Sequence, residues 1–111
     1  MVEFVSCSYL GLETHPALKK AVVDAIERFG VQVSVARTRV KVDLFPQLEA
    51  RLNDIMHGAH TLTFNAVTPT YAFGGPPSLP GIAACVAAAD LHLDGTVTAR
   101  QEKLQNVIRY L

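Results

Sequence analysis

HPALKKAVVDAIERF occupies residues 15–29, and its apolar side chains recur every three or four residues. This spacing places them on one face of an amphipathic helix. Thr14 is a candidate N-cap, Pro16 suits the first turn, and Gly30 is a typical residue just beyond a C-terminus. The sequence therefore predicts a helix from His15 to Phe29. Its apolar face comprises Leu18, Ala21, Val22, Ala25, Ile26 and Phe29.

Helical spacing also predicts three further helices downstream. The first spans 44–57, with Asp43 as its cap. The second runs from Leu79 to the Asp94-Gly95 pair, with Ser78 as its cap. The third spans 97–111 and has no stop signal. The helix that begins at Leu79 is rich in alanine, which would permit the close approach of another element.

Two short segments have the character of strands. Residues 31–42 alternate valines with polar or small residues, and residues 61–64 form a second, shorter candidate. One side of the first segment carries Arg37, Arg39 and Lys41, which fits either a solvated strand face or an edge that binds an anion. Residues 65–80 read as a loop. The predicted chain is mainly helical, with four helices and short strands near Val33–Val42 and Thr61–Phe64.

The composition excludes several classes of protein. The 111 residues have a mass of 12.0 kDa and a formal net charge of zero, so no basic field attracts nucleic acid or an anionic membrane. Half of the residues are hydrophobic, which excludes a disordered chain, and 18% are charged, fewer than usual. We expect a cytoplasmic protein with no signal peptide or membrane span. Its sparsely charged surface is expected to be covered by a second copy or by a partner chain.

The residues alone suggest no catalytic set. The four histidines are spread out, and Gly58 interrupts the helix that would align His57 with His60, so we expect no metal site. Cys7 and Cys85 are expected to be reduced and mostly buried. The run 74–77, Gly-Gly-Pro-Pro, is either a plain turn or a place where the backbone approaches a ligand.

The opening of the chain resembles a known family. Residues 6–16, SCSYLGLETHP, are similar to the N-x-Y-L-G-L…H-P opening of the α-oxoamine synthases, which include 8-amino-7-oxononanoate synthase and glycine C-acetyltransferase. The Phe29-Gly30 pair, the LEARL stretch at 48–52 and the TFN stretch at 63–65 also match. The similarity runs from Val2 to about Pro69. These enzymes are class I/II aminotransferase-like acyltransferases of fold type I, an α/β fold that carries pyridoxal 5′-phosphate (PLP).

The remainder of the chain resembles a later part of the same family. Residues 71–77, YAFGGPP, are similar to the F-S-x-x-x-P-P segment, and the two helices that follow also fit. The resemblance therefore divides the chain into an N-terminal segment, 1–70, and a small-domain segment, 71–111, that is truncated at its end. Most of the large domain would be absent between them. That part holds the ring-stacking His, the Asp that pairs with the pyridine nitrogen and the Schiff-base Lys. None of the four lysines here lies in the Lys motif.

The resemblance implies a set of site residues at the margin of a PLP site. Tyr9 and Arg37 would contact substrate, Gly74 and Gly75 would approach the cofactor phosphate, and no catalytic residue is assigned. Full-length relatives are homodimers that condense an amino acid with an acyl-CoA. This chain is then a partial or internally deleted transferase, inactive alone and without stably bound PLP. The alternatives are a non-catalytic interaction module derived from that family, or an unrelated small α/β domain.

Overall fold

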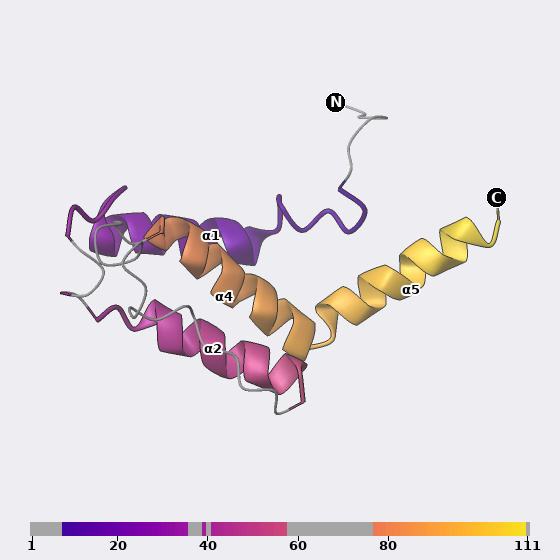
Figure 1. Ribbon diagram of the computed structural model, residues 1–111. Coiled ribbons are helices and arrows are strands. Elements are labelled where there is room, and N and C mark those ends of the chain that lie inside the picture. Colours follow the sequence, from indigo (N-terminus) through magenta and orange to yellow (C-terminus); the bar gives the residue numbers. More distant parts are fainter. Residues whose placement is uncertain (1–7, 36–38, 40, 58–76, 111) are drawn as a thin grey trace.

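The computed structural model describes residues 8–35, 39, 41–57 and 77–110, and within them it contains four helices (Figure 1). These are α1 (Pro16–Phe29), α2 (Leu44–Ile55), α4 (Leu79–Leu93) and α5 (Thr96–Ile108). All four lie where the apolar periodicity predicts a helix, so the mainly helical character is confirmed.

The helix ends depart from the predicted caps in detail. His15, not Thr14, is the N-cap of α1, and its Nδ1 accepts a hydrogen bond from the Ala17 N–H at 3.3 Å. The helix begins at Pro16 rather than His15, so the residue before it, His15, takes the N-cap position. Gly30 ends α1 as predicted, with a φ of 74°. Asp43 and Ser78 occupy the caps of α2 and α4 without a side-chain capping bond.

Helix α4 lies between α1 and α2 and packs against both (Figure 1), whereas the backbones of α1 and α2 stay apart. The sequence of α4 explains this central place, since it is apolar almost all round and a helix of that kind is stable only when covered on several sides. Its alanines also let both neighbours approach closely. The buried residues of α4 are Leu79, Pro80, Ala83, Val86, Ala89 and Leu91.

A small apolar cluster joins the three packed helices. Ala25 of α1, Leu44 of α2 and Ala83 of α4 meet there, together with Val42 and Leu79. Phe29 and Phe45, both partly buried, pack against the cluster. Ion pairs tie the same helices together, because Arg28 of α1 contacts Asp43 at 3.0 Å and Arg51 of α2 contacts Asp90 of α4 at 2.5 Å.

Helix α5 leaves this three-helix unit at an angle of 71° to α4 (Figure 1). The turn is made by Gly95, whose φ of 86° suits glycine, and Asp94 Oδ1 accepts a hydrogen bond from the Thr96 N–H at 2.8 Å. Val97, only 1% exposed, anchors the first turn. In the described part of the chain no single helix is long and apolar enough to cross a membrane, although α4 and α5 taken together pass that test as a bent pair.

The predicted strands are not seen in the described residues. Residues 31–35 form no strand, and Val31 and Val35 are exposed. Alternation of valines is not sufficient, because a strand is stabilised by pairing with a neighbour and the described chain offers no second strand. Val42 instead joins the helical core. The other candidate, Thr61–Phe64, lies outside the described residues. The expectation of buried thiols is wrong for Cys85, which is exposed, while Cys7 is not described.

Candidate functional site

The opening segment, residues 8–12, lies beside α5, although about ninety positions separate them in the sequence. Arg100 of α5 joins the two, because its Nη1 donates to the carbonyl oxygens of Leu10 at 2.6 Å and of Gly11 at 3.1 Å. Gly11 has a φ of 58°, and a Cβ added there would lie 3.5 Å from the same nitrogen. That distance is an ordinary van der Waals contact, so glycine suits this position for its backbone conformation.

Two hollows adjoin the opening segment. The larger has a volume of about 780 Å³ and the smaller about 570 Å³, and Tyr9, Leu10 and Leu104 line both. Amide side chains of α5 line the larger hollow, whereas Arg100 and Lys103 line the smaller one. The remaining residues of the larger hollow are Thr98, Gln101, Glu102, Gln105, Asn106 and Arg109.

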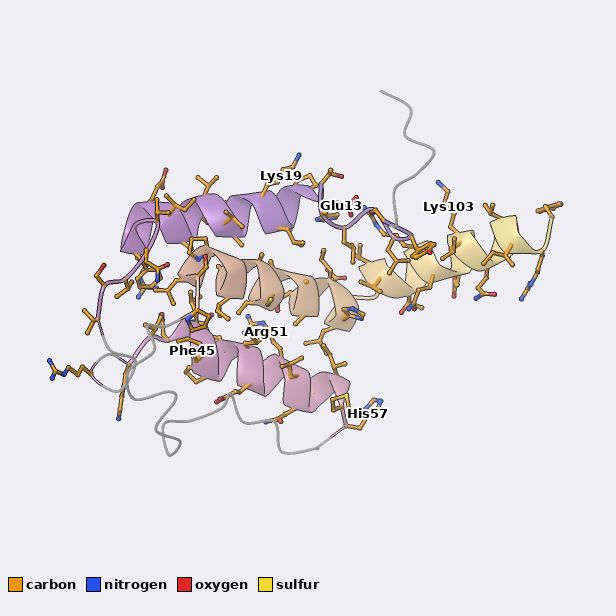
Figure 2. The ribbon with its side chains drawn as sticks, turned by 45° about the horizontal axis from the view of Figure 1, so that its top comes forward. Glu13, Lys19, Phe45, Arg51, His57 and Lys103 are labelled. Carbon is orange, nitrogen blue, oxygen red and sulfur yellow. The ribbon has the colours of Figure 1, made fainter. Side chains whose placement is uncertain are left out.

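The carboxylate of Glu13 belongs to the same region. A hydrogen bond from the Ser8 side chain, a bond from its own backbone N–H and, more weakly, the charge of Arg100 all favour the ionised form and lower the pKa of Glu13. Figure 2 shows Glu13 where the chain passes from the opening segment to α1, close to the start of α5. The side chains around residues 8–13 therefore combine one fixed carboxylate with one fixed guanidinium.

The structure describes one of the four predicted site residues. Tyr9 lies at both hollows and is 76% exposed, a position open to a ligand. Arg37, Gly74 and Gly75 lie outside the described residues, so nothing shows whether they meet Tyr9. Sequence reasoning assigned no role to Arg100, because no local pattern indicates that its partners are carbonyl groups at the other end of the chain.

The described residues do not fit PLP. Lys19, Lys20, Lys41 and Lys103 are all exposed, and Figure 2 shows Lys19 and Lys103 pointing away from the helices. An ion pair with Asp24 further raises the pKa of Lys20, which disfavours the neutral amine that an imine requires. The described chain also contains no buried charged or polar residue that could pair with the pyridine nitrogen. No chemical step through the cofactor can therefore be assigned to these residues.

No metal site is visible in the described part of the chain either. No group of three or more His, Cys, Asp or Glu residues gathers there. His15 caps α1, while His57 follows α2 with an exposed side chain that points outward (Figure 2). His60 lies outside the described residues.

Comparisons with known proteins confirm the resemblance to the α-oxoamine synthases. The chain is 36% identical over 67 residues to 8-amino-7-oxononanoate synthase of Thermoanaerobacter pseudethanolicus and 37% identical over 67 residues to that of Geobacter sulfurreducens. The synthase of Geotalea daltonii is 40% identical over 62 residues. The first two matches cover 60% of this chain but only 17% of the relatives. No family model and no solved structure matches.

The matches extend over 62 to 67 residues. The chain thus spans about a sixth of the length of these relatives. The similarity therefore concerns only a small part of such a synthase.

Proposed function

We propose that this chain is a partial PLP-dependent transferase of the 8-amino-7-oxononanoate synthase type, with no activity of its own. The observation that carries the proposal is the similarity to synthases over 17% of their length, in a chain whose four lysines are all exposed. PLP enzymes hold the cofactor through a lysine imine and act by using the ring as an electron sink. A chain without a desolvated lysine supplies neither of these.

Within a complete enzyme, we expect the opening segment and α5 to contribute an entrance for substrate. Tyr9 offers an exposed phenol, and the amide groups of Gln101, Gln105 and Asn106 offer hydrogen-bond donors and acceptors along the larger hollow. These groups can bind and orient a polar ligand but provide no strong nucleophile or base. The proposed contribution is therefore to binding rather than to proton transfer.

A direct test of inactivity uses the absorbance of the cofactor. Exposed lysines are protonated near neutral pH and form only weak, reversible imines, so we expect no imine band to survive the addition of PLP and desalting. Each of the four Lys→Ala variants should be indistinguishable from the original chain. A retained band that is lost in one variant alone would contradict the proposal and identify a lysine that rebuilt the site.

The family assignment has a separate test in a chimera. The matched 67 residues of this chain would replace the aligned segment of the Thermoanaerobacter pseudethanolicus synthase. We expect the chimera to retain PLP and measurable synthase activity, while the present chain releases no coenzyme A from an acyl thioester. A folded chimera that retains PLP but has no activity would show that this segment is not equivalent to the enzyme's own.

A second candidate, a non-catalytic interaction module, is favoured by the large exposed surface. The accessible area is 8233 Å², whereas a folded 12 kDa monomer is expected to expose about 6,000 Å². The radius of gyration is 16.8 Å, against about 13 Å for a compact domain of this length. The excess area is on the order of what partners bury in stable complexes. In this proposal the chain associates with a second copy or with a full-length relative.

A further inference from the structure

We propose that the opening segment, residues 8–12, is a detachable strap across a groove on α5 and that Arg100 is the positioning residue that latches it. This inference rests on the proposed function only in so far as the region is an entrance for substrate. The latch itself is a matter of contacts between described residues, and it can be tested without any activity.

The two hollows are the first argument for a strap. Both are lined by Tyr9 and Leu10 on one wall and by Leu104 of α5 on the other. The larger hollow continues along α5 toward Arg109, and the smaller one includes Lys103 and Val107. Tyr9 and Leu10 of the segment are common to both hollows, together with Leu104 of α5. Removal of the segment would therefore join the hollows into one groove along α5.

The second argument is that a single side chain makes both bonds of the latch. The half-buried guanidinium of Arg100 donates through one nitrogen to two successive carbonyl groups, those of Leu10 and Gly11. Hydrogen bonds from a charged donor are stronger than neutral ones, and a guanidinium cannot lose its charge at accessible pH. Loss of this side chain breaks both bonds at once and leaves two carbonyl groups without their donor.

The third argument is the weak apolar attachment of the segment. Tyr9 exposes most of its side chain, and Leu10, Gly11 and Leu12 are only half-buried, so little apolar area holds the strap in place. Release would cost the core little, because the cluster around Ala25 and Leu79 includes no residue of this segment. The strap can open while the three-helix unit stays folded.

The test compares three variants of the full chain: Arg100→Ala, Arg100→Lys and the control Arg109→Ala, an exposed arginine at the C-cap of α5. Because Tyr9 is exposed, chymotrypsin is expected to cleave after it slowly in the original chain and faster once the segment is released, and mass spectrometry identifies that product. Circular dichroism and thermal unfolding report the helical core independently.

We expect Arg100→Ala to speed cleavage after Tyr9 by about tenfold or more, the effect of losing hydrogen bonds to a charged group, while the thermal midpoint stays nearly constant. Arg100→Lys should be intermediate, because an ammonium group keeps donors but lacks the planar fork. Arg109→Ala should cleave like the original chain. Unchanged cleavage in Arg100→Ala, or an equal loss of the helical core, would overturn the latch.

The synthase chimera distinguishes the two proposals. If Arg100→Ala is cleaved faster and the chimera is inactive, the strap proposal stands and the proposed role as a substrate entrance is refuted. Unchanged cleavage beside an active chimera would refute the strap and retain the family role of the segment.

Discussion

At the scale of single residues, the opening segment depends on a few polar groups that act over short distances. Glu13 accepts a hydrogen bond from Ser8, and Arg100 donates to the Leu10 and Gly11 carbonyls. The sequence predicted none of these contacts, and it predicted a site residue in this segment only at the neighbouring Tyr9. The prediction for Tyr9 came from the resemblance to the α-oxoamine synthases. The partners of Arg100, in contrast, depend on how α5 returns to the start of the chain. No pattern within either segment could have indicated this contact.

Glu13 provides a pH prediction for this segment. Its pKa is lowered in the folded chain, chiefly by the Ser8 hydroxyl, so its ionised form stabilises the segment above the unfolded value of 4.5. That contribution is lost as the pH falls through the lower folded-state pKa. We expect an NMR titration of the Glu13 carboxyl to show a midpoint below 4.5.

Two substitutions show how much each neighbouring group lowers the pKa of Glu13. Ser8→Ala should return the pKa of Glu13 most of the way toward its ordinary value, and Arg100→Ala should move it less, since the charge of Arg100 is the weaker influence. A midpoint in the original chain at or above 4.5 would show that the hydroxyl does not hold this carboxylate in solution.

At the scale of elements, helices were predictable and strands were not. The apolar period of 15–29 and the all-apolar character of 79–93 are local properties, and both segments are helices in the structure. Residues 31–35 have strand propensity without a strand partner, and pairing is a property of the whole chain. The cap of α1 also escaped prediction, because an imidazole at His15 performs the task expected of Thr14.

The packing of the three-helix unit depends on helix α4, and a substitution of Leu79 tests this dependence. Its side chain is 2% exposed in the cluster that joins the three helices. Leu79→Ala removes buried methyl groups and leaves a cavity, so we expect it to lower the free energy of unfolding by about 2–5 kcal/mol. Urea unfolding followed by circular dichroism measures this loss.

The matched control lies on the same helix. Leu93 is 47% exposed, and Leu93→Ala should change the free energy of unfolding much less. Equal effects of the two substitutions would mean that α4 does not occupy the middle of the packed unit in solution.

At the scale of the whole molecule, the chain exposes more surface than its mass warrants. Apolar side chains contribute to this surface on several elements, including Val23 on α1, Met56 after α2, and Val107 and Ile108 on α5. A formal net charge of zero gives little repulsion between copies. The sequence indicated this property through its low charge content, but it could not show which elements carry the exposed apolar side chains.

We therefore expect the purified chain to self-associate. Light scattering at tens of micromolar, on the order of the dissociation constants of modest interfaces, should give a mass well above 12.0 kDa. Val107→Lys combined with Ile108→Lys should lower that mass if the α5 face takes part, whereas Lys19→Ala, on the outer face of α1, should not. A clean monomer of the original chain over this concentration range would contradict the expectation.

The central place of α4 also has a consequence for biosynthesis. The ribosome releases α1 and α2 well before α4, yet the backbones of these two helices approach α4 and not each other. They have 14 and 12 residues, lengths at which an isolated helix is marginal in water. The nascent chain therefore carries two unsupported apolar faces until α4 emerges. We expect chaperones that bind newly made chains to recognise these faces during that interval.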